Sequence, residues 1–69
     1  MILVFKTTVT TREEIKKLKV HLDELLLNAR WNFDLDDCDN ILRVDGPENM
    51  EDHIINLLNR HGFDCMELV

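Results

Sequence analysis

Thr11 and Glu14 are the two residues of this chain whose types and spacing most directly invite a chemical role. They lie three positions apart, at the start of a run of apolar residues with helical spacing, and Thr10 and Glu13 repeat the same pattern. A hydroxyl and a carboxylate at this spacing can bond the free backbone amides of a helix N-terminus and form a capping box. The same oxygen atoms could instead ligate a hard cation. We expect the capping box, because it accounts for both residues.

A second set of residues combines the side chains that zinc and cobalt prefer as ligands. It consists of Cys38, His61 and Cys65, with acidic residues on both sides of Cys38. Cysteine, histidine and aspartate can together hold such a metal. The two cysteines lie far apart in the chain, however, and isolated cysteines usually pack as small apolar residues or remain free thiols in a reducing compartment. This cluster is therefore an alternative site rather than the expected one.

Six predicted elements position these residues within one domain that spans residues 1–69. Hydrophobic periods of two and of three to four alternate along the chain, with turn residues between them. The predicted strands and helices cover residues 2–9 (strand), 10–29 (helix), 31–35 (strand), 41–44 (strand), 50–61 (helix) and 64–69 (strand). Right-handed connections in this order give an α+β, ferredoxin-like βαββαβ sandwich. We expect a four-stranded antiparallel sheet of order 4-1-3-2, with both helices on one face.

The apolar pattern also predicts which side chains are buried. Alternate residues of the first strand and a stripe along the first helix should form the core, with Val20, Leu26 and Leu27 widening that stripe. Gly62 is placed to end the second helix in a left-handed conformation, which lets Phe63 fold back onto the core. The sheet face away from the helices would then expose Ile2, Val4, Ile41 and alternate residues of the last strand, which is more apolar surface than a monomer normally leaves in water.

The second half of the chain resembles the heavy-metal-associated (HMA) domain family. The residues that carry the resemblance are Gly46 after a strand pair, Ile54-Ile55 and Leu57-Leu58 in the following helix, and Gly62-Phe63 before the last strand. The family's diagnostic motif, M-x-C-x-x-C, falls on residues 9–14, so that Thr11 and Glu14 occupy the two cysteine positions. The resemblance therefore implies an HMA-like domain that lacks the copper-type transfer site, and we expect no metal at Thr11 and Glu14.

Composition and charge narrow the range of partners. The chain carries 8 basic and 14 acidic residues, for a net charge of −6. Nucleic acid requires a basic surface, so we expect no nucleic-acid partner. The five apolar residues at the start are too few for a signal peptide or a membrane span, so we expect a cytoplasmic protein without membrane contact.

These observations together favour a small binding module. We expect a protein partner, which includes a second copy of the chain, and no cofactor. No catalytic constellation is present: an acylphosphatase-like hydrolase on this fold would need a phosphate-cradling loop and paired Arg and Asn side chains. We therefore expect no enzyme activity. The alternative function is metal binding by the cluster of Cys38, His61 and Cys65.

Overall fold

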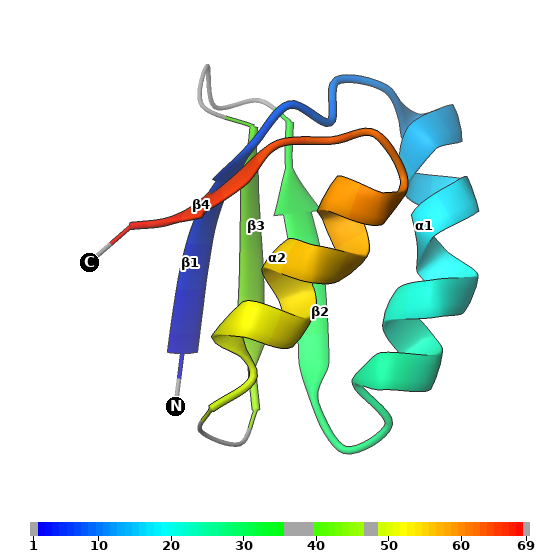
Figure 1. Ribbon diagram of the computed structural model, residues 1–69. Helices are drawn as coiled ribbons and strands as arrows, with labels where there is room; N and C mark the ends of the chain where they lie inside the picture. Colours follow the sequence, from blue (N-terminus) through cyan, green and yellow to red (C-terminus); the bar gives the residue numbers. More distant parts are fainter. Residues whose placement is uncertain (1, 36–39, 47–48, 69) are drawn as a thin grey trace.

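The computed structural model describes residues 2–35, 40–46 and 49–68, and all six expected elements are present in the expected order (Figure 1). They are β1 (Ile2–Thr7), α1 (Arg12–Leu25), β2 (Arg30–Asp34), β3 (Ile41–Asp45), α2 (Glu51–Arg60) and β4 (Cys65–Glu67). The chain is thus a small α+β domain. In the described part of the chain, neither helix combines the length and the apolar character that a membrane crossing requires.

The four strands form one sheet with the order β2-β3-β1-β4, which reads 4-1-3-2 when counted from β4. Every neighbouring pair is antiparallel. The register places Val4 opposite Arg43 and Lys6 opposite both Ile41 and Met66. Residues that lie opposite each other share a face of the sheet, so these pairs define which side chains look away from the helices.

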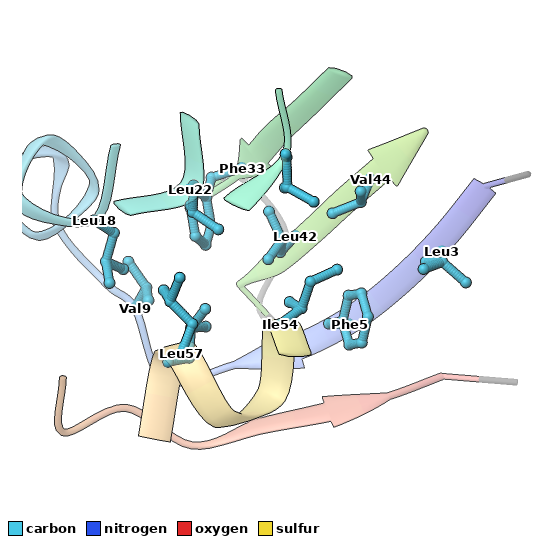
Figure 2. Close-up of a cluster of buried hydrophobic side chains, with 12 residues drawn as sticks. Leu3, Phe5, Val9, Leu18, Leu22, Phe33, Leu42, Val44, Ile54 and Leu57 are labelled. Atoms are coloured by element: carbon cyan, nitrogen blue, oxygen red, sulfur yellow. The ribbon is translucent and has the colours of Figure 1, made fainter. Parts of the chain in front are cut away.

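The core lies between the sheet and both helices (Figure 2). In β1 the buried residues are Leu3, Phe5 and Thr7, whereas the residues between them point to the other face. Val9 lies beyond the end of β1 and is nevertheless fully buried. The helices contribute Leu18, Leu22, Ile54, Leu57 and Leu58 to the same cluster. Because one cluster holds side chains of both helices, both cover the same face.

Helix α1 is shorter and narrower on its buried side than the sequence predicts. It ends at Leu25, and the side chain of Leu26 is buried as expected. The prediction that Val20 and Leu27 widen the buried stripe is wrong, since they are 59% and 81% exposed. Val20 lies about 200° around the helix from buried Leu18, and Leu27 lies in the turn after the helix.

The C-terminus of α2 has the predicted glycine cap. Gly62 has a φ of +88° and follows the C-cap residue His61. The amide of Phe63 donates to the carbonyl of Leu58 at 2.9 Å, and the amide of Gly62 donates to that of Asn59 at 3.1 Å. These two bonds make a Schellman motif. Phe63 packs partly buried against the core, as expected.

Candidate functional site

The first strand-to-helix loop and the loop before β4 meet at one end of the sheet, at the top of Figure 1. The amide of Thr8 donates to the carbonyl of Asp64 at 3.2 Å, and the amide of Asp64 donates to the Thr8 hydroxyl at 2.9 Å. The buried hydroxyl of Thr7 donates to the carbonyl of Asn40 at 2.7 Å. The candidate metal ligands predicted from the sequence were expected at this end of the sheet.

Thr11 and Glu14 form the predicted capping box at the start of α1. Thr11 is the N-cap, and its hydroxyl accepts the amide of Glu14 at 3.2 Å. The Oε1 atom of Glu14 accepts the amides of Thr10 at 3.0 Å and Thr11 at 3.1 Å, as well as the Thr10 hydroxyl at 3.1 Å. The bond from the Thr10 amide is the main cause that lowers the pKa of the Glu14 carboxyl below its ordinary value. The box therefore keeps an ionised carboxylate at the positive end of the helix.

The Oε1 atom of Glu14 accepts three hydrogen bonds, and these bonds explain why this helix start is a cap and not a cation site. Thr10 adds two bonds to the two bonds of the box, and the four bonds together use the free amides of Thr10, Thr11 and Glu14. A cation would have to compete with these amides for the same oxygen, so the corner is built as a helix cap.

Replacing Thr11 by alanine should lower the free energy of unfolding by about 1 kcal/mol, because the N-cap acceptor is lost. Thermal or urea unfolding would measure the change. Thr11→Ser is the matched control, since it keeps the hydroxyl and should stay close to the unsubstituted chain. If serine costs as much as alanine, the hydroxyl is not what stabilises the helix start.

The structure places only part of the alternative metal cluster. Cys38 and the acidic residues beside it fall outside the described residues. Cys65 is a half-buried free cysteine on β4, and burial raises the pKa of its thiol to about 12. Burial therefore disfavours the thiolate form that a metal would bind. Across the described ranges, no three His, Cys, Asp or Glu side chains lie close enough together to hold a metal ion.

His61 instead contacts a histidine of the other helix. Its ring lies 4.3 Å from the ring of His21, centroid to centroid, with 35° between the two planes. Both side chains are exposed. The sequence analysis did not find this pair, because its two members lie 40 positions apart and meet only through the packing of α1 against α2. The sequence could have indicated this contact only through the predicted fold, which packs the two helices side by side on one face of the sheet.

The second candidate surface is the sheet face away from the helices, which we call the open face. Its apolar half lies on β1 and β4 and consists of Ile2, Val4, Met66 and Leu68. Ile2, Met66 and Leu68 are 68%, 61% and 41% exposed, and Val4 is half-buried. The expectation that Ile41 is also exposed there is wrong: it is buried between Lys6 and Asp34, its neighbours on β1 and β2.

The other half of the open face, on β2 and β3, is polar. The register aligns Arg30 with Asp45 and Asn32 with Arg43. Arg43 also forms an ion pair with Asp34 across the two strands, at 3.7 Å between Nη1 and Oδ2. This half therefore carries two arginines and two aspartates, and their charges balance.

Trp31 lies on the helix side of β2 and is not part of the open face. Its indole nitrogen donates to Asp23 of α1 at 3.0 Å, and Lys19 forms an ion pair with the same carboxylate at 2.7 Å. These two bonds, that from Lys19 first, lower the pKa of Asp23. Trp31 is half-buried and also meets Phe33 edge-on, with ring centroids 5.9 Å apart. The tryptophan therefore joins the edge strand to α1.

Comparison with known proteins gives no match that would assign a role to these surfaces. No family model, no curated protein and no solved structure matches the chain. The resemblance to HMA domains therefore rests on the sequence pattern described above.

Proposed function

We propose that this chain is a protein interaction module that associates with a second copy of itself through the apolar half of the open face. The observation that carries the proposal is the exposure of Ile2, Met66 and Leu68 on adjacent strands of that face. Grouped apolar side chains of this kind mark interfaces in soluble proteins. The proposal assigns the chain no catalytic role and no resident metal at Thr11 and Glu14.

We further propose that the domain is ferredoxin-like and descends from the HMA type. The strand order and the two helices on one face support the first part. The glycine after β3 and the Gly62-Phe63 ending of α2 support the second. In such a domain without thiol ligands, the surface that remains for binding is the sheet. A cytoplasmic location agrees with the free thiol of Cys65.

The distribution of charge favours a second copy as the partner. An interface between identical chains is self-complementary, because the same patch is used twice. A two-fold axis over β1 and β4 would set one apolar half against the other. It would leave the polar halves at the rim, where their two arginines and two aspartates carry no net charge and remain hydrated. Lys6 lies among the apolar residues of this face, opposite Met66, and its long side chain can carry the ammonium group to the hydrated rim of the interface.

The substitution Met66→Glu should turn an associating chain into a monomer. It places a carboxylate in the centre of the apolar half, where a second copy would have to desolvate it. The fold should tolerate the change, because Met66 is 61% exposed on β4, an edge strand of the sheet. Sedimentation equilibrium or native mass spectrometry would report the subunit count.

Val20→Glu is the matched control. Val20 is 59% exposed, close to the 61% of Met66, but it lies on α1, away from the open face. Both variants change the charge equally, so only position differs, and Val20→Glu should associate like the unsubstituted chain. Association should also strengthen as salt shortens the Debye length from about 30 Å to about 8 Å, since each copy is acidic. A monomeric unsubstituted chain, or equal association of both variants, would contradict the proposal.

A further inference from the structure

We propose that the outer edge of β2 binds an extended, acidic segment of a partner protein, which adds to the sheet as a fifth strand beside a basic row on α1. The basic row consists of Arg12, Lys16 and Lys19. β2 and β4 lie at opposite ends of the sheet, so this site is separate from the apolar half of the open face. It goes beyond the proposed self-association, because its occupant is a different protein.

The outer edge of β2 is open to the addition of a strand. β2 ends the sheet on one side, and among the described residues the backbone from Arg30 to Phe33 has hydrogen-bond partners only on β3. The backbone groups that point the other way face solvent, and such a row is a template for a further strand. β2 has no proline, no lysine and no bulge in its register with β3, three features that commonly block such pairing.

The basic row lies on the side of α1 next to this edge (Figure 1). Its members follow one another at steps of four and three residues, and Asp23 continues the series. Residues at this spacing share one side of a helix. Asp23 accepts the indole N–H of Trp31 at 3.0 Å, and Arg12 lines a hollow together with Phe33. The helix rises about 16 Å between the ends of the series, close to the length of β2, about 17 Å, so the row runs along the whole edge.

The hollow between α1 and β2 has room for side chains of an added strand. It measures about 280 Å³ and is lined by Arg12, Ile15, Asn32, Phe33, Asp34 and Leu35. Alternate residues of an added strand would share the helix side of the sheet with Phe33 and face the basic row. Acidic side chains at these alternate positions suit Arg12, because a guanidinium group binds carboxylates. Asp34 is the one acidic residue of the lining, and its ion pair with Arg43 offsets its charge.

The charge of α1 favours a different protein over a second copy at this edge. The three basic side chains of the row are exposed, and together with the one carboxylate of Asp23 they carry a net charge of +2. Pairing of β2 with β2 of a second copy would bring two such rows next to each other. Like charges placed side by side oppose association, whereas an acidic segment would be attracted by the row.

Titration with a synthetic peptide, followed by NMR, tests the site. The probe is acetyl-Thr-Glu-Val-Glu-Val-Glu-Thr-amide, which alternates carboxylates with residues that favour strands. It should slow amide hydrogen exchange at alternate residues of β2, because an added strand bonds the outward amides, and leave β4 unchanged. A peptide with lysine in place of each glutamate should bind more weakly, as should one with proline in place of both valines, which cannot form a regular strand.

Lys16→Glu should weaken binding of the glutamate peptide by about fivefold, the upper range for an exposed charge pair. Lys17→Glu is the matched control. Both lysines are exposed and neighbours in the chain, and both variants change the charge equally, but Lys17 lies about 100° around the helix from the row. Lys17→Glu should therefore bind the peptide like the unsubstituted chain.

Failure of the glutamate peptide to bind, or equal weakening by Lys16→Glu and Lys17→Glu, would overturn the proposal. So would binding that leaves amide exchange in β2 unchanged, since the peptide would then not be an added strand. If the Met66→Glu chain still associates and its β2 amides are protected without peptide, a second copy occupies the edge and the proposal is wrong. Peptide binding does not depend on the open face, so the proposed self-association is judged separately by comparing Met66→Glu with Val20→Glu.

Discussion

The double substitution Thr11→Cys with Glu14→Cys is expected to create a copper(I) site. The two native residues already bond each other across the first turn of α1: the backbone amide of Glu14 donates to the Thr11 hydroxyl at 3.2 Å, and the backbone amide of Thr11 donates to the Glu14 carboxylate at 3.1 Å. Two thiols at these positions would lie one helical turn apart on the same side of the helix start. The amides that now donate to the Thr11 hydroxyl and the Glu14 carboxylate would be available to stabilise thiolates, as would the helix dipole. Soft thiolates are the ligands that copper(I) selects.

Titration under reducing conditions, in competition with a copper(I) chelator, would measure the gain. Thr11→Ser with Glu14→Gln is the control, because it retains hydrogen-bonding groups at both positions without adding sulfur. It should bind no more copper(I) than the unsubstituted chain. If the cysteine pair binds no better than this control, the alignment of residues 9–14 with the family motif is wrong, and the HMA proposal is reduced to a likeness of fold.

Replacing Gly46 by alanine should lower the free energy of unfolding by about 1–3 kcal/mol, the usual cost of overpacking. A Cβ atom built on Gly46 would lie only 2.5 Å from the Cβ of Ala29, a separation that carbon atoms do not tolerate. Either the turn before β2 or the end of β3 must then move. Urea unfolding monitored by circular dichroism would give the change.

Adding Ala29→Gly to the Gly46→Ala variant tests whether the contact with Ala29 causes the loss of stability. It removes the methyl group that the new Cβ would meet, so the double variant should recover most of the stability lost by Gly46→Ala. The remaining contact, with the Cα of Ala29 at 3.6 Å, is ordinary. A double variant as unstable as Gly46→Ala would show that the cost arises in the backbone of residue 46 and not in the contact with Ala29.

Local signals in the sequence were sufficient where neighbours in the chain decide the structure. The capping box depends on residues three apart, and the Gly62 cap on the residues just before and after it. The inward residues of β1 follow from its alternation. In each case the interacting groups lie within one or two turns of each other, so the pattern of residue types already contains the contact.

At Val20 and Leu27, residue type was a poor guide: both have the residue types of a core but lie outside it, because the helix turns Val20 away and ends before Leu27. The sequence was also a poor guide where distant elements decide the structure. Ile41 is buried by its neighbours on adjacent strands. The contact of His21 with His61 depends on how two helices pack side by side. The burial of Ile41 and the contact of the two histidines have no short-range pattern that would indicate them.

The bond between Trp31 and Asp23 gives the chain an internal optical probe. Trp31 is the single tryptophan, and the chain has no tyrosine, so near-ultraviolet excitation above the phenylalanine band reaches this one indole. Its N–H is held by a carboxylate of α1 while its ring packs partly against the core. Emission wavelength and quenching by solutes therefore follow the attachment of the edge strand to the helix, and any opening of that corner is visible without a label.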